Sequence, residues 1–215
     1  MLPEINTDFL TMRNMKKLLL SIIAVAGLAF SSNAQTEQGK WVLGGAVSFT
    51  SEKAEGADKA NTEFSIIPSV GYFVANDISV GVGVGYTSSK DIGFEKTSAF
   101  IVSPFGRYYK SIGESGQFKF FGQVSVPMAF GKVEDVDADG NVGDEQGKTT
   151  VIGVNLAPGF AFFPSKRVAI EFSLNGLTYA NQSAEDADGN DLGGSDTFSF
   201  DTNFFTPRVG IQFHF

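Results

Sequence analysis

Four charged residues occupy positions that otherwise carry small or polar side chains. Each stands directly before a large apolar or aromatic residue, so an extended strand turns it to the opposite face from that neighbour; the four are Arg107, Lys119, Glu171 and Arg208. Charges enclosed in a fold must be paired, because an isolated buried charge is very costly. The pattern predicts an interior charge network with an Arg107–Glu171 ion pair. We favour structural polar filling as its role; the alternative is a gate in a narrow conduit, for which the many small inward residues would leave room.

Two acidic segments have the alternate-carboxylate spacing of calcium loops. Asp135-Val-Asp-Ala-Asp-Gly-Asn141 places a glycine where such a loop turns sharply, and Asp186-Ala-Asp-Gly-Asn190 repeats its core. Gln146 stands at the twelfth position, where a bidentate glutamate is wanted. Asp-Gly and Gly-Asn also make good hairpin tips. We favour tips kept solvated by charge over metal sites.

Residues for covalent catalysis are scarce. There is no cysteine, and the sole histidine, His214, is next to the C-terminal residue. Ser-His-Asp and Cys-His arrangements are therefore not available at a surface formed by distant loops. Gly81, Gly83 and Gly85 alternate within a strand and do not form a phosphate-binding loop. We expect no enzyme activity, no cofactor and no metal.

The elements that carry these residues are predicted strands. Apolar residues alternate with small or polar ones in eight segments. These are 41–50, 64–72, 78–87, 100–108, 118–130, 152–162, 168–175 and a last one that ends at Phe215, with a bulge where its apolar phase shifts between Phe204 and Phe205. The bulky face is uniformly apolar and the other is rich in Gly, Ala and Ser. A soluble sandwich would place its charges outside instead. The pattern predicts an all-β fold, an eight-stranded antiparallel transmembrane up-and-down β-barrel.

The connections fit that topology. Residues 74–77 and 164–167 are short turns, whereas 51–62, 132–148 and 180–197 are long, polar and acidic. Short and long connections alternate in outer-membrane barrels, with the turns in the periplasm and the loops outside. Trp41, Tyr72, Tyr86, Tyr108 and Phe162 cluster near strand ends, as interfacial aromatic girdles do.

The N-terminal region has the layout of an export signal. A basic segment at Met15-Lys-Lys17 precedes an apolar run from Leu18 to Phe30 and small residues that end at Ala34. We expect residues 1–34 to be an over-called start plus a signal peptide, and residues 35–215 to be one barrel domain. That mature chain has 13 Lys and Arg against 22 Asp and Glu. This acidic balance argues against a nucleic-acid partner. Without cysteine the chain is not a lipoprotein.

Three features together resemble a known group. The segments Pro68-Ser-Val-Gly-Tyr-Phe73 and Pro104-Phe-Gly-Arg-Tyr-Tyr109, with the terminal aromatic Phe215, are similar to the small outer-membrane β-barrel family, which is OmpX-like and related to the OmpA membrane domain. The resemblance implies a monomer in the outer membrane of Gram-negative type, in contact with the lipid bilayer and lipopolysaccharide. It also implies insertion by the outer-membrane assembly machinery, with Ile211, Phe213 and Phe215 as the assembly signal. A peptidoglycan-binding domain of the OmpA type is not expected.

The function that follows is structural, or surface interaction through the acidic loops. The alternative is a narrow channel or transporter for small or hydrophobic compounds. A lipid-modifying enzyme is disfavoured by the single histidine.

Overall fold

The computed structural model describes residues 36–53, 55–56, 59–201 and 208–215. The expected signal peptide and the expected phase shift between Phe204 and Phe205 lie outside these residues. The described residues contain no helix, and therefore none long and apolar enough to cross a membrane. They form eleven strand segments: β1 (Trp41–Glu52), β2 (Asn61–Ala75), β3 (Ile78–Lys90), β4 (Glu95–Ile112), β5 (Phe118–Ser125), β6 (Met128–Val136), β7 (Val142–Ser165), β8 (Val168–Ser173), β9 (Gly176–Asp186), β10 (Asp191–Asp201) and β11 (Arg208–His214).

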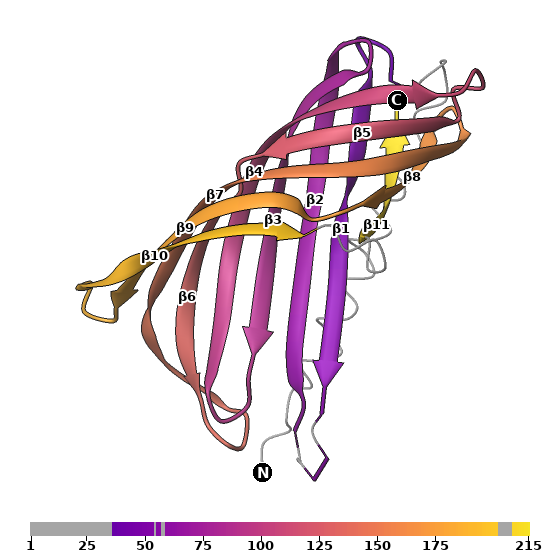
Figure 1. The fold of residues 1–215 in the computed structure, drawn as a ribbon. Coiled ribbons are helices and arrows are strands. Elements are labelled where there is room, and N and C mark those ends of the chain that lie inside the picture. The colour runs from indigo at the N-terminus through magenta and orange to yellow at the C-terminus, as the bar shows by residue number, and fades with distance from the viewer. Residues whose placement is uncertain (1–35, 54, 57–58, 202–207) are drawn as a thin grey trace, which may run out of the picture.

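The eleven segments make eight barrel strands, because three pairs of consecutive segments each belong to one strand. β5 and β6 pair with successive parts of β4 and β7, and β8 and β9 with successive parts of β7. β10 and β11 form the last strand. The sheet closes where Leu43 of β1 pairs with Phe213 of β11, and every pairing is antiparallel (Figure 1). The predicted all-β, eight-stranded up-and-down barrel is confirmed.

The two ends of the barrel differ. One end, called the terminal end here, holds Trp41, Phe215 and the short connections between β2 and β3, β4 and β5, and β7 and β8. The other, called the hairpin end, holds the connections after β1, β3, β6 and β9. The alternation of connections is therefore the one expected from the sequence.

Two of the expected long loops are strands over most of their length. β6 and β7 pair until Val136 faces Val142, and β9 and β10 pair until Glu185 faces Asp191. Glu134 of β6 forms ion pairs with Lys96 of β4 at 3.1 Å and with Lys132 of its own strand at 2.7 Å, so charges beyond the apolar belt match between β6 and its other neighbour β4. The expected loops 132–148 and 180–197 are thus corrected to hairpins with tips of only 137–141 and 187–190. Within the expected connection 51–62, the described residues 53, 55–56 and 59–60 are not strand.

The outer surface of the barrel is apolar around its whole girth. Along β3, for example, Ile78, Val80, Val84 and Tyr86 are exposed, whereas Ser79 is fully buried. Neighbouring outward aromatics contact one another near the terminal end: Trp41 meets Tyr72 edge-on at 5.1 Å between ring centroids. The alternation read from the sequence therefore assigned the outward and inward faces correctly.

The interior at the terminal end is packed with rings. Phe73, Tyr109, Phe121, Phe163 and His214 are all at most 1% exposed, and we call these five residues the aromatic plug. Their centroids form a chain from Phe121 through Tyr109, Phe73 and His214 to Phe163, with neighbours 5.2–5.8 Å apart. The barrel is therefore filled by side chains across this level.

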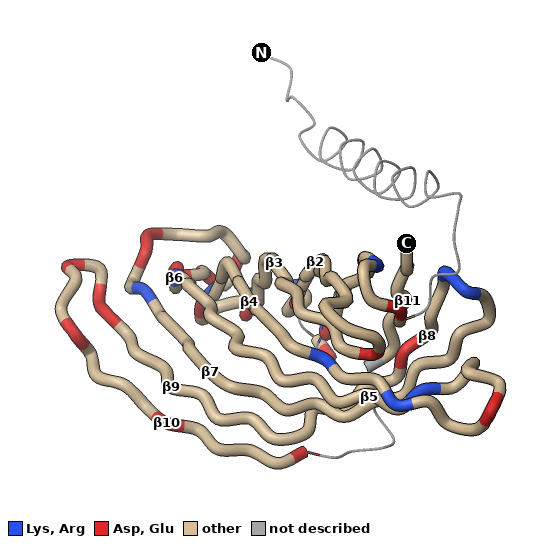
Figure 2. The backbone as a smooth tube through the Cα atoms, turned by 90° about the horizontal axis from the view of Figure 1, so that it is seen from above, with Lys and Arg blue, Asp and Glu red and all other residues tan. Residues whose placement is uncertain are grey.

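At the hairpin end, two strands of the described part of the chain lack a pairing partner on one side. Among the described residues β10 pairs only with β9, and β1 from Gly44 onward pairs only with β2. β10 lies at the outer edge beside β9, on the other side of the molecule from β2 (Figure 2). We call the space between the described parts of β1 and β10 the β1–β10 opening.

Candidate functional site

An ion pair crosses the barrel interior directly above the aromatic plug. Arg107 enters from β4 and Glu171 from β8, both on the inward face of their strands. Arg107 Nη1 lies 2.7 and 2.8 Å from the two carboxylate oxygens of Glu171. The two side chains are 11% and 6% exposed. At this burial each charge needs the other, because either alone would be strongly unfavourable.

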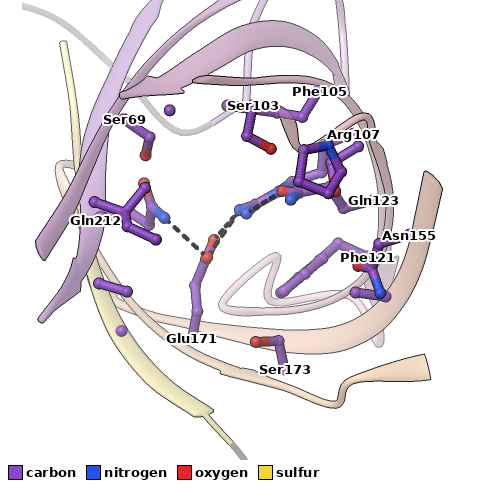
Figure 3. A pocket seen from close by; sticks show the side chains of 18 of the residues that line it. Ser69, Ser103, Phe105, Arg107, Phe121, Gln123, Asn155, Glu171, Ser173 and Gln212 are labelled. Atoms are coloured by element: carbon purple, nitrogen blue, oxygen red, sulfur yellow. Dashed lines mark hydrogen bonds and ion pairs between the residues drawn. The ribbon is translucent and has the colours of Figure 1, made fainter. Parts of the chain in front are cut away.

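Three further side chains complete the hydrogen bonding of this pair (Figure 3). Gln123 accepts bonds from Arg107 Nε and Nη2 at 2.9 and 2.6 Å. Tyr109 accepts from Arg107 and donates to Glu171, and Gln212 donates to the other carboxylate oxygen at 3.1 Å. We call these five residues the polar floor. The guanidinium also lies 4.4 Å from the ring centroid of Phe121, so the floor rests on the plug.

The other two residues of the expected network lie elsewhere. Lys119, on β5 four residues from Gln123, sits at the terminal end, where Nζ donates to Asp77 Oδ1 at 2.7 Å and to Thr36 Oγ1 at 2.6 Å. The Thr36 hydroxyl also donates to Asp77. These hydrogen bonds hold Thr36, the first described residue, beneath the aromatic plug. Arg208 begins β11 opposite Ser173, and its side chain lies outside the described part of the structure.

A cavity of about 440 Å³ lies above the polar floor. Polar side chains that line it include Ser69, Ser103 and Asn155 (Figure 3). Apolar side chains that line it include Ile67, Ile101, Phe105 and Leu174. We call it the lumen cavity. A second cavity of about 600 Å³ lies at the terminal end, lined by Thr36, Asp77, Lys119 and Lys166 among others. The two cavities share no lining residue, because the plug lies between them.

The sequence analysis missed the neutral members of the floor. Gln123 shares strand parity with Lys119, and Gln212 shares it with Arg208, so parity alone would have turned them inward. Tyr109 was hidden by the pair Tyr108-Tyr109, in which only the first ring faces outward. Charged residues stand out among the small inward residues of the pattern, whereas the two amide side chains do not.

The acidic hairpin tips have one geometry in common. Asp137 accepts bonds from the backbone and side-chain nitrogens of Asn141 at 2.8 and 2.9 Å, and Asp186 does the same with Asn190. These bonds favour the charged carboxylate and hold the pKa of Asp137 and of Asp186 below its ordinary value. No group of three carboxylate or histidine side chains in the described chain is arranged to hold a metal ion.

The residues of the expected assembly signal face outward on or beside β11. Ile211 is 54% exposed and Phe213 is partly exposed. The backbone of Phe215 exchanges two hydrogen bonds with Trp41, at 2.9 and 3.1 Å. His214, between them in sequence, is fully buried in the plug, so it is remote from the hairpin tips.

Solved structures with a similar fold are small outer-membrane barrels. Neisserial surface protein A matches with a TM-score of 0.51 and 13% identity, over 82% of this chain and 97% of that chain. OprG from Pseudomonas aeruginosa matches at a TM-score of 0.46 and 13% identity, over 86% and 99%. A major outer membrane protein from Thermus thermophilus matches at 0.40 and 15%, over 82% and 99%. No protein-family model and no curated protein matches the chain. At such identity the likeness concerns the fold.

Proposed function

We propose that the chain is an integral outer-membrane barrel that presents acidic hairpins at the cell surface for interaction with other molecules. The observation that carries membrane insertion is the continuous apolar exterior. Large apolar side chains on every barrel strand are exposed, among them Val80, Phe120, Val154 and Phe172. Water would penalise so much exposed apolar surface, whereas hydrocarbon does not. The terminal end then faces the periplasm and the hairpin end faces outward.

The interaction surface is the pair of hairpins β6–β7 and β9–β10. Their tips carry the same five residues, Asp-Ala-Asp-Gly-Asn, and the bonds from Asn141 and Asn190 hold both tips in one shape. Within each tip the central carboxylate, Asp139 or Asp188, is exposed. Figure 2 shows acidic residues along the hairpins at this side of the barrel. A basic partner surface is the complementary chemistry.

Membrane insertion is tested by cell fractionation and heat-modifiable migration. The folded chain should co-purify with the outer membrane and should migrate faster on gels before boiling than after it. Recovery of the processed chain as a water-soluble monomer without detergent contradicts the proposal.

The hairpin role is tested with fluorescent polylysine on intact cells that express the protein. The Asp139→Asn/Asp188→Asn variant should bind several-fold less probe, and the difference should shrink at high salt. Glu114→Gln is the matched control, because Glu114 is exposed at the terminal end and is shielded from the probe in whole cells. Equal binding by the tip variant and the native protein rules out these carboxylates as the contact.

A second function, uptake or binding of small apolar compounds, is favoured by one observation. The lumen cavity is lined on one side by Gly45 and Ala46 of β1 and on the other by Val209 and Gly210 of β11, so it reaches the wall beside the β1–β10 opening. The plug below blocks a straight passage to the terminal end. Binding within the lumen cavity is therefore the part of this function that the geometry supports.

A further inference from the structure

Three aromatic rings mark the boundary of the apolar exterior toward the hairpin end. Tyr86 of β3 lies directly opposite Phe100 of β4, which lies directly opposite Phe130 of β6. All three face outward and are 42–50% exposed, and we call them the aromatic row. Aromatic residues gather between hydrocarbon and head groups in outer-membrane barrels. The aromatic row therefore lies where the head groups of the leaflet at the hairpin end begin.

Four lysines lie just beyond the aromatic row on the same outward face. Lys132 of β6 is directly opposite Lys148 of β7, and Lys90 of β3 is directly opposite Lys96 of β4. We call these four residues the lysine cluster. Lys132 is two residues beyond Phe130, which is about 7 Å along an extended strand. The long lysine side chains can rest on the apolar exterior and place their ammonium groups at the level of the lipid head groups.

The charge of the lysine cluster is only partly neutralised. Glu134 forms ion pairs with two of its members, and Glu145 lies opposite Glu134. Glu185 lies opposite Lys148, yet Lys148 forms no hydrogen bond or ion pair with the described residues. Like charges directly opposite each other disfavour strand pairing. An anion bound between the facing lysines would relieve this repulsion.

A buried hydroxyl lies within the lysine cluster. Ser98 is on the outward face of β4, two residues from Lys96 and directly opposite Lys132. It is 4% exposed, and its Oγ has no hydrogen-bond partner in the described part of the chain. Buried hydroxyls normally have such a partner. An anionic oxygen held between Lys96 and Lys132 would accept bonds from this hydroxyl and from both ammonium groups.

The acidic hairpin tip of β6 and β7 does not repel an anion from this position. Asp137 begins the tip five residues beyond Lys132, which is about 17 Å along an extended strand. Charges that far apart are largely screened at physiological ionic strength, where the Debye length is about 8 Å. Asp135, between them, alternates to the opposite face of β6. The local charge at the lysine cluster is therefore the one that a ligand meets.

We propose that the lysine cluster binds the anionic phosphate head group of a lipid in the leaflet at the hairpin end. The phosphate lies between the ammonium groups beside Ser98, and the acyl chains lie along Phe100 and Phe130. A lipid contacts the lysines and the rings together, whereas free phosphate contacts the lysines alone. This inference rests on the proposed membrane insertion and gives the barrel a lipid partner besides the partner of its acidic tips.

The test uses a tryptophan placed in the aromatic row. Trp41 is the only tryptophan, so Phe130→Trp in a Trp41→Phe background gives one fluorescent reporter beside the lysine cluster. The protein is reconstituted in dioleoylphosphatidylcholine vesicles that contain increasing fractions of brominated phosphatidylcholine or brominated phosphatidic acid. Brominated phosphatidic acid should quench the reporter at least about fivefold more strongly, because one lysine near a membrane surface contributes an effect of this order. Equal quenching by the two lipids overturns the inference.

Removing two lysines tests the site itself. Lys132→Gln/Lys148→Gln in the reporter protein should bring the ratio of the two quenching constants close to one. Lys53→Gln/Lys59→Gln is the matched control, because it removes the same charge from the connection after β1 at the same end of the barrel. Heat-modifiable migration shows that each variant is folded. An unchanged ratio in folded Lys132→Gln/Lys148→Gln, or an equal loss in the control, overturns the inference.

Inorganic phosphate separates a lipid head group from a free anion. It should lower the preference for phosphatidic acid no more than chloride does at the same ionic strength. Complete loss of the preference in millimolar inorganic phosphate, but not in chloride, would assign the site to the free anion and overturn the lipid assignment.

A second reporter position separates this inference from membrane insertion. Val154→Trp in the Trp41→Phe background lies on the outward face of β7, six residues from Lys148, and both brominated lipids should quench it equally. Quenching there without any preference at Phe130→Trp overturns the lipid site and leaves membrane insertion intact. A Val154→Trp reporter that neither lipid quenches refutes the proposed function itself.

Discussion

At the scale of single residues, the Arg107–Glu171 pair can stabilise the barrel in two ways: by net attraction, or by each charge compensating the burial of the other. Its nitrogen and oxygen atoms are 2.7–2.8 Å apart and nearly buried. At such burial the second effect is the larger contribution to the free energy of unfolding. Removing one partner therefore differs from removing both.

Glu171→Gln should lower the free energy of unfolding by about 3–5 kcal/mol, because it strands the Arg107 charge inside the barrel. Urea unfolding of the barrel in lipid vesicles measures the change. The double variant Arg107→Met/Glu171→Leu removes both charges and should lose less than Glu171→Gln alone. A double variant that loses the sum of the two single changes contradicts this account.

The hairpin tips give a pH-dependent effect of known sign. The Asn141 bonds hold the pKa of Asp137 below its ordinary value of 3.8. A carboxylate whose pKa is lower in the folded tip stabilises that tip above pH 3.8, and the contribution is lost as pH falls through the lowered pKa. NMR titration of Asp137 should show this low midpoint, and Asn141→Ala should move it back toward 3.8. An unchanged midpoint in that variant assigns the shift to another cause.

At the scale of elements, strand alternation predicted the two faces but not the length of the strands. Outward Val80 and inward Ser79 follow from the period of two alone. The same period could not predict that β6 and β7 continue beyond the apolar belt. Lys132, Glu134 and Lys148 look like loop residues, and only the cross-strand pairing makes them strand residues. The interruption at Val126-Pro127 was likewise hidden, although proline lacks the N–H that a ladder needs.

The packing of β2 against β3 depends on two facing glycines. Gly71 lies opposite Gly81, and the Phe105 ring covers them from inside. A Cβ at Gly81 would collide with the Val70 carbonyl oxygen and lie 2.6 Å from Phe105 Cζ. Gly81→Ala should destabilise the barrel by about 1–3 kcal/mol. Gly106→Ala should be close to neutral in the same urea assay, because nothing lies within 4 Å of its Cβ position. Equal losses in the two variants would show that space is not the cause.

The last strand carries the assembly prediction. Deleting Phe215 removes two backbone bonds to Trp41 and the terminal aromatic, and the heat-modifiable fraction in the outer membrane should fall several-fold. Phe215→Trp keeps the bonds and an aromatic ring and should assemble normally. Unfolding of the purified deletion variant distinguishes slow insertion from low stability. A deletion variant that assembles normally in cells removes Phe215 from the assembly signal.

At the scale of the whole molecule, the plug decides whether the barrel conducts. It separates the lumen cavity from the terminal cavity, and its five rings are at most 1% exposed. Native protein in planar bilayers should therefore show no steady conductance.

Phe73→Ala/Phe163→Ala removes two plug rings and should open a water path, with conductance well above the native baseline. Because the double variant also costs several kcal/mol of packing, Phe120→Ala/Phe160→Ala is the matched control. It removes two contacting rings from the outward face of neighbouring strands and should stay silent. Native protein that conducts as strongly as the plug variant would mean that the plug is not the barrier, and the narrow-channel function would replace binding within the lumen cavity.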